Sequence, residues 1–435
     1  MAIPEMKWCF AIWLPPATNY KGRFLSVGDG GFAGVIETNF ILADLNLDLG
    51  FAIAGGDGSY FAANNDVGNG APGVYLPFLH DRDQDKGWIH NGTSIFTPAA
   101  KAIAKAHYGQ IRYSYYDGCS TSGAQGFALA QFHPTLYDGI VASSPGNYYI
   151  HLALSFLWNF LSASSTMSYI PQKKLTAMTK AVVAVCDGED GVEDGVIANP
   201  PLCEFDVDSF ACSAMNSSLN STDCLPAAQL ITSKAIYAGP KRRDNGAQIY
   251  PGFGFGSESS WMYQETVLAD AFSYNAATFN FASDVDTVDK KAGAYIDEIS
   301  PDLQAFHSHG VKLLTVQGWA DQLNSPYWPI EHLRQVEAVF GGPVDSWFEL
   351  FMAAGAGHCG ANPLFPNAPG TYATTAAMID WVETGVIPKQ IEASQPSSGT
   401  NVMRKLCPYP QYAKYVSGNV NDRTSFACEY QEWAL

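Results

Sequence analysis

A serine follows a cysteine directly in the run of small residues "YDGCSTSGAQG", which covers residues 116–126. The glycines allow the backbone a sharp turn between a strand and a helix, and such a turn can present a serine side chain as a nucleophile. A serine is a weak nucleophile until a nearby base takes its proton. Ser120 is therefore a candidate nucleophile, provided that the chain also supplies the base.

Two further residues complete a catalytic set in a recognisable order along the chain. Asp321 follows the strand-like "KLLTVQGWA", and His358 follows "ELFMAAGAG" in a glycine-rich loop. Serine, aspartate and histidine at successive strand ends, in this order, form the α/β-hydrolase arrangement. Taken singly, each residue has a simpler explanation, because most aspartates and histidines are solvated or cap a helix. The combination predicts a catalytic triad of Ser120, Asp321 and His358.

The serine motif is incomplete, because Ser122 stands where a Gly-x-Ser-x-Gly motif has its second glycine. The cysteines supply independent support: Cys119 precedes the candidate nucleophile and Cys359 follows the candidate base. A base in hydrogen-bond reach of the serine brings these neighbours close, and a disulfide needs Cα atoms roughly 4.4 to 6.8 Å apart. We predict a disulfide between Cys119 and Cys359, the alternative being a buried free thiol.

The elements around these residues alternate between the periodicities of strands and helices. Strand-like runs occur at 23–31, 50–56, 111–118, 139–144, 311–321 and 346–360, and helix-like runs at 97–109, 123–133 and 374–385. This alternation is typical of an α/β fold with a mostly parallel sheet covered by helices. Between about 160 and 300 the alternation gives way to four cysteines, an acidic glycine loop and an aromatic stretch. We interpret that segment as an inserted domain.

Charge and hydropathy exclude several classes of partner. The 24 Lys and Arg against 42 Asp and Glu give a net charge of -18, which argues against nucleic-acid binding. The longest apolar stretch, at 148–165, is interrupted by polar residues, so we expect a buried helix and no membrane contact. The first residues, "MAIPEMKWCF", have no visible signal peptide. The composition predicts a soluble protein and leaves its oligomeric state open.

The nine cysteines are scattered along the chain, which disfavours a zinc site and suits separate disulfides. Once Cys119 is matched to Cys359, the nearest-neighbour pairings are Cys186 with Cys203, Cys212 with Cys224 and Cys407 with Cys428. This scheme leaves Cys9 free. Four disulfides predict an extracellular, secreted protein.

Together these motifs resemble the tannase and feruloyl esterase family of secreted serine esterases, with its CS, D and HC arrangement. The resemblance covers nearly the whole chain, including "WLPPATNYKGRFLSVGDGGFAG", "FHPTLYDGIVASSPG", "DWVETGVIP" and "RKLCPYPQYAKY". It implies Ser120 as nucleophile, His358 as general base and then acid, and Asp321 as the group that orients the imidazole. Two positions depart from the family pattern: it has glycine at Ser122 and arginine at Ala124, which leaves the acyl preference open.

The negative charge that develops on the substrate in acyl transfer needs backbone donors held in place beforehand. The amide of Thr121, directly after the nucleophile, is the first candidate. The second donor is expected from "GDGGFAG", where we choose Gly31, with Gly30 nearly as good and a plain tight turn as the alternative.

The acidic loop "CDGEDGVEDGVIANPPLC" combines clustered carboxylates with glycines that let the backbone curl around an ion. Hard oxygen ligands suit Ca²⁺, although the spacing does not match an EF-hand. The family resemblance implies a structural calcium site in the lid. Its ligands would be the side chains of Asp187, Asp190 and Asp194 and the backbone oxygens of Val192 and Val196. A solvated acidic turn is the alternative.

We therefore expect an α/β-hydrolase domain at 1–160 and 301–435, interrupted by a lid domain with the calcium loop at 161–300. The resemblance implies hydrolysis of phenolic acid esters of feruloyl, caffeoyl or galloyl type through an acyl-serine intermediate. Aromatic residues between 250 and 263 are candidates for lining the cleft. No organic cofactor is implied. The alternatives are an esterase for other small aromatic or aliphatic esters, and an inactive calcium-stabilised binding protein of the same fold.

Overall fold

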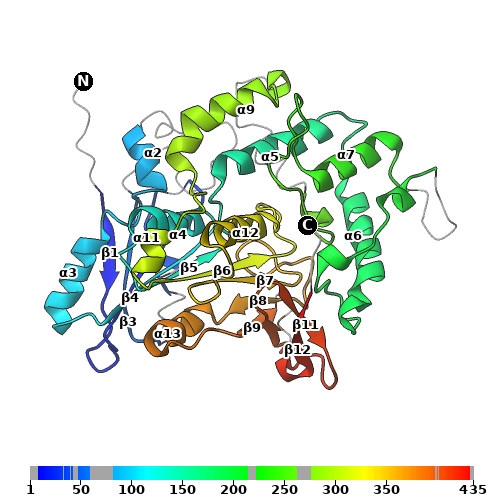
Figure 1. Cartoon of the computed structure of the whole chain (residues 1–435). Helices are drawn as coiled ribbons and strands as arrows, with labels where there is room; N and C mark the ends of the chain where they lie inside the picture. The colour runs from blue at the N-terminus through cyan, green and yellow to red at the C-terminus, as the bar shows by residue number, and fades with distance from the viewer. Residues whose placement is uncertain are drawn as a thin grey trace.

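The computed structural model describes residues 8–32, 34–39, 41–42, 48–58, 82–213, 222–261, 276–396, 399 and 401–431. Its centre is a seven-stranded sheet in the order β1-β3-β2-β4-β5-β6-β7 (Figure 1). The strands are β1 (Phe10–Trp13), β2 (Arg23–Val27), β3 (Phe51–Gly56), β4 (Tyr113–Cys119), β5 (Gly139–Ser143), β6 (Lys312–Gly318) and β7 (Phe348–Ala353). Only the pairing of β1 with β3 is antiparallel within this sheet. The predicted α/β class is confirmed.

Side chains alternate between the two faces of the sheet and build two separate apolar cores. On β6, for example, Leu313 belongs to one core and Leu314 to the other. The first core includes side chains of α3 (Thr97–Tyr108), α4 (Thr121–Phe132), α11 (Gln304–Ser308) and α12 (Trp328–Phe340). The second includes side chains of α13 (Thr374–Thr384). This two-sided burial explains why the strands are nearly continuous in apolar residues.

The connection from β5 to β6 is a large insertion (Figure 1). Its helices are α5 (Tyr149–Ala163), α6 (Gln172–Cys186), α7 (Ala227–Ala238), α9 (Ser283–Val288) and α10 (Ala294–Ile296). Its short 3₁₀ and π turns are at 187–190, 200–202, 207–210, 258–260, 276–278 and 289–293. A core of its own includes Leu175, Phe210 and Trp261. The boundary predicted at 160/161 falls inside α5, so α5 joins the insertion to the sheet domain.

After β7 the chain adds two small antiparallel sheets. They contain β8 (Pro369–Tyr372), β9 (Ile391–Pro396) and β10 (Arg404–Leu406), and β11 (Gln411–Tyr415) and β12 (Phe426–Tyr430). Helix α2 (Arg82–Trp88) precedes α3, and a 3₁₀ turn at 423–425 precedes β12.

All four predicted disulfides are present: Cys119–Cys359, Cys186–Cys203, Cys212–Cys224 and Cys407–Cys428. Cys9 is free and exposed, as predicted.

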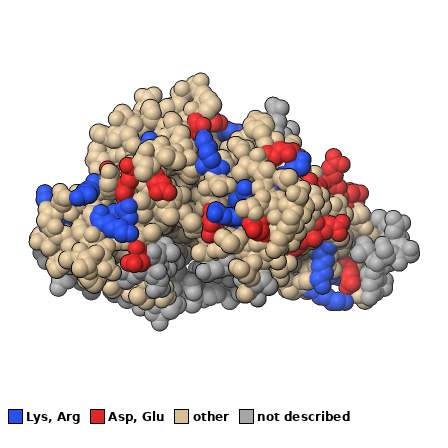
Figure 2. Space-filling model, turned by 90° about the horizontal axis from the view of Figure 1, so that it is seen from below, with Lys and Arg blue, Asp and Glu red and all other residues tan. Residues whose placement is uncertain are grey.

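The distribution of charge on the surface and the length of the helices are relevant to two possible partners, nucleic acid and membrane. On the face shown in Figure 2, Lys and Arg side chains lie in small separate groups among acidic and uncharged surface. Among the described helices, none is long and apolar enough to cross a bilayer. The absence of a nucleic-acid partner stays a prediction.

Candidate active site

Ser120 occupies a sharp turn between the end of β4 and the start of α4. Its backbone has φ 68° and ψ -121°, in the left-handed half of conformational space that costs a non-glycine residue about 1 to 3 kcal/mol. Neighbouring backbone holds the turn: the Ser120 amide donates to the Ser143 carbonyl at 3.0 Å, and the Gly146 amide donates to the Ser120 carbonyl at 3.1 Å. A side chain at Gly123 would place its Cβ 2.5 Å from the Ser143 oxygen. The turn therefore requires glycine there.

The three predicted triad residues form one hydrogen-bonded chain. His358 Nε2 lies 2.8 Å from Ser120 Oγ. His358 Nδ1 lies 3.1 and 3.0 Å from the two carboxylate oxygens of Asp321. With the proton on Nδ1, the imidazole donates to the aspartate and keeps Nε2 free to accept from the serine. This geometry can take the proton from Ser120 as the hydroxyl attacks.

Asp321 is fully buried yet held as a carboxylate. Burial opposes its ionisation, but the adjacent His358 and the hydrogen bonds to the carboxylate outweigh burial, and the pKa of Asp321 lies below its usual value. Its oxygens accept from the amides of Leu323 at 2.8 Å and Asn324 at 3.0 Å, and from Gln317 Nε2 at 3.0 Å. These donors fix the carboxylate against the imidazole.

The histidine loop is bonded to three other segments: the serine turn, the loop of Asp321 and the end of β5. The disulfide joins Cys119 to Cys359 across 240 positions with their Cα atoms 5.9 Å apart. The His358 amide donates to Gln322 Oε1 at 3.1 Å, and the Cys359 amide donates to Ser144 Oγ at 3.3 Å. Sequence reasoning missed Gln322 and Ser144, because no local pattern marks a side chain that bonds to a distant backbone amide.

The predicted oxyanion donors belong to two segments that pack together, because Phe32, next to Gly31, contacts a cluster that includes Ala124 of α4. Thr121 is the first residue of α4 and is buried. Gly31 adopts φ 55°, and its carbonyl accepts from Trp88 Nε1 at 2.9 Å. The backbone of Gly30 hydrogen bonds to the carboxyl group of Glu37, which favours Gly31 over Gly30 as the free donor.

Comparison with known proteins agrees with this geometry. The family described as tannase and feruloyl esterase matches residues 3–288 and 265–429. The chain belongs to this family. A probable feruloyl esterase of Arthroderma benhamiae is 31% identical over 96% of this chain and 82% of its own length. An uncharacterised esterase of Xanthomonas campestris is 31% identical over 96% of this chain and 81% of its own length.

Solved structures of the family have the same fold. Feruloyl esterase B from Aspergillus oryzae superposes with a TM-score of 0.83 at 27% identity, covering 97% of this chain and 87% of that one. Tannin acyl hydrolase from Aspergillus niger superposes with a TM-score of 0.81 over 99% of this chain and 84% of that one. Its 21% identity supports the fold alone. The protein is an α/β-hydrolase and, as a member of this family, a carboxylic ester hydrolase.

The two departures from the family pattern have local explanations. Ser122 Oγ accepts from the Cys119 amide at 2.9 Å and donates to the Cys119 carbonyl at 2.7 Å, so the hydroxyl satisfies the end of β4. Ala124 is fully buried in a cluster with Trp88 and Ile296. The Ser122 hydroxyl thus bonds to the backbone of the residue before the nucleophile, and the methyl group of Ala124 cannot hydrogen bond to the triad.

The expectation for the aromatic stretch at 250–263 needs correction where the structure describes it. Tyr250, Phe253 and Trp261 are buried. Phe253 and Trp261 pack in the core of the insertion, and Tyr250 packs against Leu152. Phe255 is only partly buried against the same core, so the prediction stays open for this residue. Residues 262 and 263 lie outside the described residues.

The acidic loop curls around its own carboxylates. Asp187 accepts from the amides of Asp194, Gly195 and Val196 at distances of 2.8 to 3.1 Å. Glycines at 191 and 195, with φ 99° and 82°, make the two turns that this path needs. Asp190 accepts from the Val192 amide at 3.2 Å.

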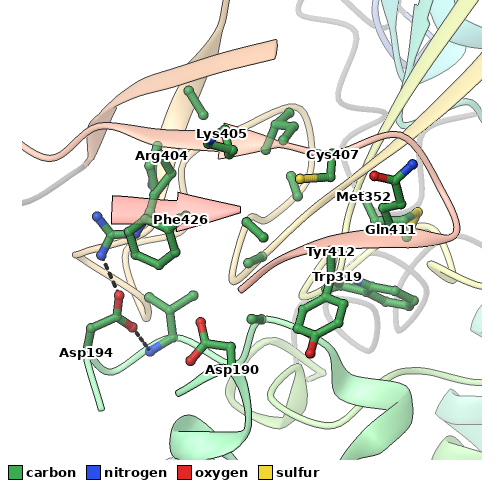
Figure 3. A pocket seen from close by; sticks show the side chains of 18 residues that line it. Asp190, Asp194, Trp319, Met352, Arg404, Lys405, Cys407, Gln411, Tyr412 and Phe426 are labelled. Atoms are coloured by element: carbon green, nitrogen blue, oxygen red, sulfur yellow. Dashed lines mark hydrogen bonds and ion pairs between the residues drawn. The ribbon is translucent and has the colours of Figure 1, made fainter. Parts of the chain in front are cut away.

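These carboxylates also repel one another. Burial raises the pKa of Asp190 to about 7, and the negative charges of Asp194 and Asp187 add to the shift. Burial likewise raises the pKa of Asp194, although Arg404 opposes this. Asp190 and Asp194 line a cavity with Arg404 of β10 and Tyr412 of β11, as Figure 3 shows. Arg404 offsets part of this negative charge through its ion pair with Asp194, and the carboxylate oxygens that line the cavity are hard ligands of the kind that Ca²⁺ prefers.

Another group of possible ligands is excluded by its chemistry. Among the residues that the structure describes, Cys186, Glu189 and Cys203 place three potential ligand atoms within 4.8 Å of one another. The two sulfurs are joined in a disulfide, so they are not thiolate ligands.

The Cys119–Cys359 bridge leads to a prediction about activity. Replacing both cysteines by alanine should lower kcat on the order of a hundredfold, with a modest change in KM. Without the bridge His358 can shift relative to Ser120, and a displacement of about 1 Å in a reacting group lowers the rate by about that factor. Each single variant should match the double variant, since either change breaks the same bond. Steady-state kinetics and thermal unfolding of the three variants test this.

The Cys407–Cys428 bridge, which joins neither the serine turn nor the histidine loop, is the control. Its removal should lower the Tm, because a disulfide typically contributes about 2 to 4 kcal/mol to stability. It should leave kcat of the folded enzyme within about twofold, because it joins no segment of the triad. A Cys119/Cys359 double variant with normal kcat would contradict the positioning role of the bridge.

Proposed function

We propose that this protein hydrolyses esters of phenolic acids, of feruloyl, caffeoyl or galloyl type, through an acyl-Ser120 intermediate. The observation that carries the proposal is the 2.8 Å contact from His358 Nε2 to Ser120 Oγ in a chain that ends on a buried carboxylate. The substrate class is supported by the names of relatives, which include a probable feruloyl esterase and feruloyl esterase B.

The mechanism follows from the positions of these atoms. Ser120 Oγ attacks the ester carbonyl carbon while its proton passes to His358 Nε2. The imidazolium that forms is stabilised by Asp321 through Nδ1. The negative charge on the former carbonyl oxygen is met by the amides of Thr121 and Gly31. His358 then protonates the leaving alcohol, and the ester bond breaks to leave acyl-Ser120.

The second half of the cycle reverses these roles. Water enters the place of the alcohol, and His358 takes its proton as it attacks the acyl carbon. The same amides meet the second oxyanion. His358 returns the proton to Ser120 as the phenolic acid leaves, so the enzyme ends in its starting state.

A panel of esters tests the substrate class. The specificity constants kcat/KM are compared for methyl ferulate, methyl caffeate, methyl gallate and p-nitrophenyl acetate. A phenolic methyl ester should be preferred to simple aliphatic methyl esters measured in parallel. Preference for the aliphatic esters would replace the proposal with a general small-ester esterase. Absence of both turnover and labelling of Ser120 by an organophosphonate would indicate a binding protein.

The proposal includes residues 161–300 as a lid over the catalytic domain. Contacts between the two parts support it: Ser325 Oγ donates to the Gly252 carbonyl at 2.6 Å, and Ile296 packs against Trp88. Four disulfides support an extracellular location.

The acidic loop is proposed to hold one structural Ca²⁺. The side chains of Asp187, Asp190 and Asp194 and the carbonyls of Val192 and Val196 would be its ligands. When bound, the ion supplies the positive charge that offsets these carboxylates. The ion pair of Asp194 with Arg404 of β10 also connects the loop to the C-terminal sheets, so the loop contacts a part of the chain outside the insertion.

Chelation tests this site. An ion that binds only the native loop stabilises it by mass action, so EDTA should lower the Tm by roughly 3 °C relative to calcium at about 100 times its Kd. The Asp190→Asn variant should lose this calcium-dependent shift. Glu193→Gln, which alters an exposed carboxylate of the same loop, should keep it. A wild-type melting curve that EDTA leaves unmoved would show that the loop is only an acidic turn.

A further inference from the structure

The loop that carries Gly31 begins in very close contact with the nucleophile helix. A Cβ on Gly28 would lie 2.3 Å from Gln125 Oε1 and 2.4 Å from Ser122 Cβ, so the Gly28 backbone lies directly against the first turns of α4. The next residue, Asp29, is 2% exposed. Burying a carboxylate costs free energy unless the group is hydrogen bonded. The groups that bond to Asp29 therefore also fix the position of this loop.

One partner of this carboxylate is Gln125 of α4. Its Nε2 donates to Asp29 Oδ1 at 2.5 Å and to the Trp88 carbonyl at 2.8 Å. Its Oε1 accepts from Tyr116 at 3.3 Å and from Thr93 at 3.4 Å. The amide is 1% exposed and its hydrogen-bonding groups are used on both sides, so its orientation is determined.

A second connection leads from this amide to the proposed oxyanion donor. The Trp88 carbonyl accepts from Gln125, and the Trp88 indole Nε1 donates to the Gly31 carbonyl at 2.9 Å. Gln125 thus holds the Gly31 loop from two directions, through Asp29 before it and through Trp88 beside it. Gln125 and Thr121 lie one turn apart on α4. The bonds of Gln125 to Asp29 and Trp88 therefore hold the Gly31 loop to the same helix that carries the Thr121 amide.

We infer that Gln125 is a positioning residue that sets the Gly31 amide against Ser120 and so controls oxyanion stabilisation. The inference rests on the proposed function. Oxyanion donors act because they are in place before charge develops, and losing one costs roughly a hundredfold to a thousandfold in kcat. A loop displaced by about 1 Å loses a comparable factor. Substrate binding makes little use of these amides, so KM should change little.

The test compares two glutamines of α4 that each face a buried carboxylate. Gln125→Glu replaces the donor to Asp29, and Gln131→Glu replaces the 2.9 Å donor to Glu298 at the far end of the helix. Both changes conserve side-chain size and put two carboxyl groups together. Gln131 is less buried than Gln125, so Gln131→Glu should lower the Tm no more than Gln125→Glu does, and only Gln125→Glu should lower kcat, on the order of a hundredfold.

Two measurements separate positioning from a general loss of structure. The rate of Ser120 phosphonylation, which uses the same oxyanion site, should fall in parallel with kcat for Gln125→Glu, whereas the Ki of ferulate should stay within about twofold. The exchanged pair Asp29→Asn with Gln125→Glu restores an amide-to-carboxylate bond and should recover about tenfold or more in kcat. If Gln125→Glu does not fold, Gln125→Met removes the donor without adding charge.

The outcomes distinguish this inference from the proposed function. A wild-type enzyme without esterase activity would overturn both. An active wild type with normal kcat and phosphonylation in a folded Gln125→Glu or Gln125→Met variant would overturn only the positioning role. Equal losses of kcat in the Gln125 and Gln131 variants would also overturn it, because the effect would then be one of stability.

Discussion

Ser120→Ala should lower kcat on the order of a millionfold while the protein stays folded. Loss of the nucleophile removes the acyl-enzyme route, and the remaining rate over water comes from binding and the oxyanion donors alone. The substitution removes one oxygen and leaves the backbone turn in place, so the Tm should change little. Steady-state turnover of p-nitrophenyl acetate and a melting curve measure both expectations.

Ser122→Ala is the matched control for this prediction. It removes a hydroxyl two positions away whose bonds go to the Cys119 backbone and not to His358. Turnover should therefore remain within about tenfold of wild type, since losing a hydrogen bond of this kind costs about 1 kcal/mol. Activity that survives in Ser120→Ala but is lost in Ser122→Ala would reassign the nucleophile.

Asp321→Asn should lower kcat by about ten-thousandfold, the second largest effect. The asparagine oxygen can still accept from the amides of Leu323 and Asn324, so the loop keeps its shape. Its amide nitrogen, however, would face His358 as a donor and hold the imidazole in the wrong tautomer. The base would then present a proton to Ser120 where it needs a lone pair.

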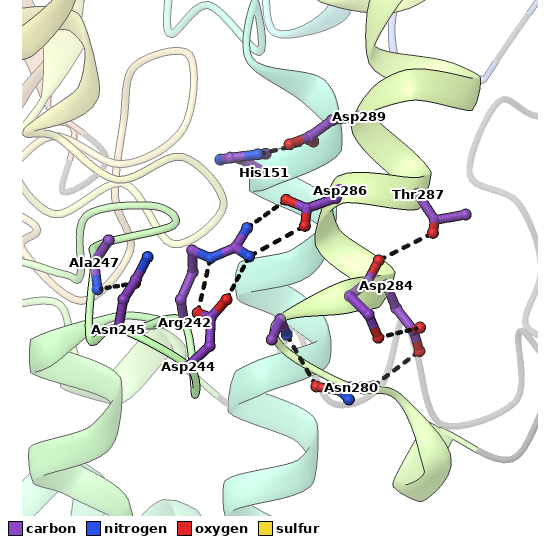
Figure 4. Close-up of polar contacts among 12 residues, drawn as sticks. His151, Arg242, Asp244, Asn245, Ala247, Asn280, Asp284, Asp286, Thr287 and Asp289 are labelled. Carbon is purple, nitrogen blue, oxygen red and sulfur yellow. Dashed lines mark hydrogen bonds and ion pairs between the residues drawn. The ribbon is translucent and has the colours of Figure 1, made fainter.

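A second histidine and aspartate pair supplies the control. His151 Nε2 lies 2.9 Å from Asp289 in the insertion, as Figure 4 shows, and no member of the triad takes part in that cluster. Asp289→Asn should change kcat less than about twofold, because only structural packing depends on it. Comparable losses in the two variants would contradict an orienting role specific to Asp321.

Much of the site was predictable because its chemistry is tied to local positions in the chain. Ser120, Asp321 and His358 each follow a strand, and parallel strands deliver their carboxyl ends to one edge of the sheet. The adjacent cysteines carried the same information, since a bond between Ser120 and His358 brings Cys119 and Cys359 together. The other three disulfides join near neighbours in sequence, separated by 12 to 21 positions.

Other features depend on which distant segments pack together. The sequence left Gly30 and Gly31 nearly equivalent as candidate oxyanion donors, and only the folded chain brings Glu37 to the Gly30 backbone, which supports Gly31 as the proposed donor. It also marked the aromatic stretch at 250–263 as a candidate cleft lining, whereas Tyr250 is 1% exposed. A residue type predicts that a side chain will be buried or hydrogen bonded. Only the tertiary packing determines which residues it contacts.

By itself, the sequence determined the fold class, the order of the triad and the partner of every paired cysteine. These follow from strand periodicity, from residues next to strand ends and from a small number of cysteines that must pair. The tertiary structure alone decided that Gln125 meets Asp29 across 96 positions and that Arg404 meets Asp194 across 210. Such contacts have no local signature, because a buried polar group is satisfied by whichever donor the folded chain places beside it.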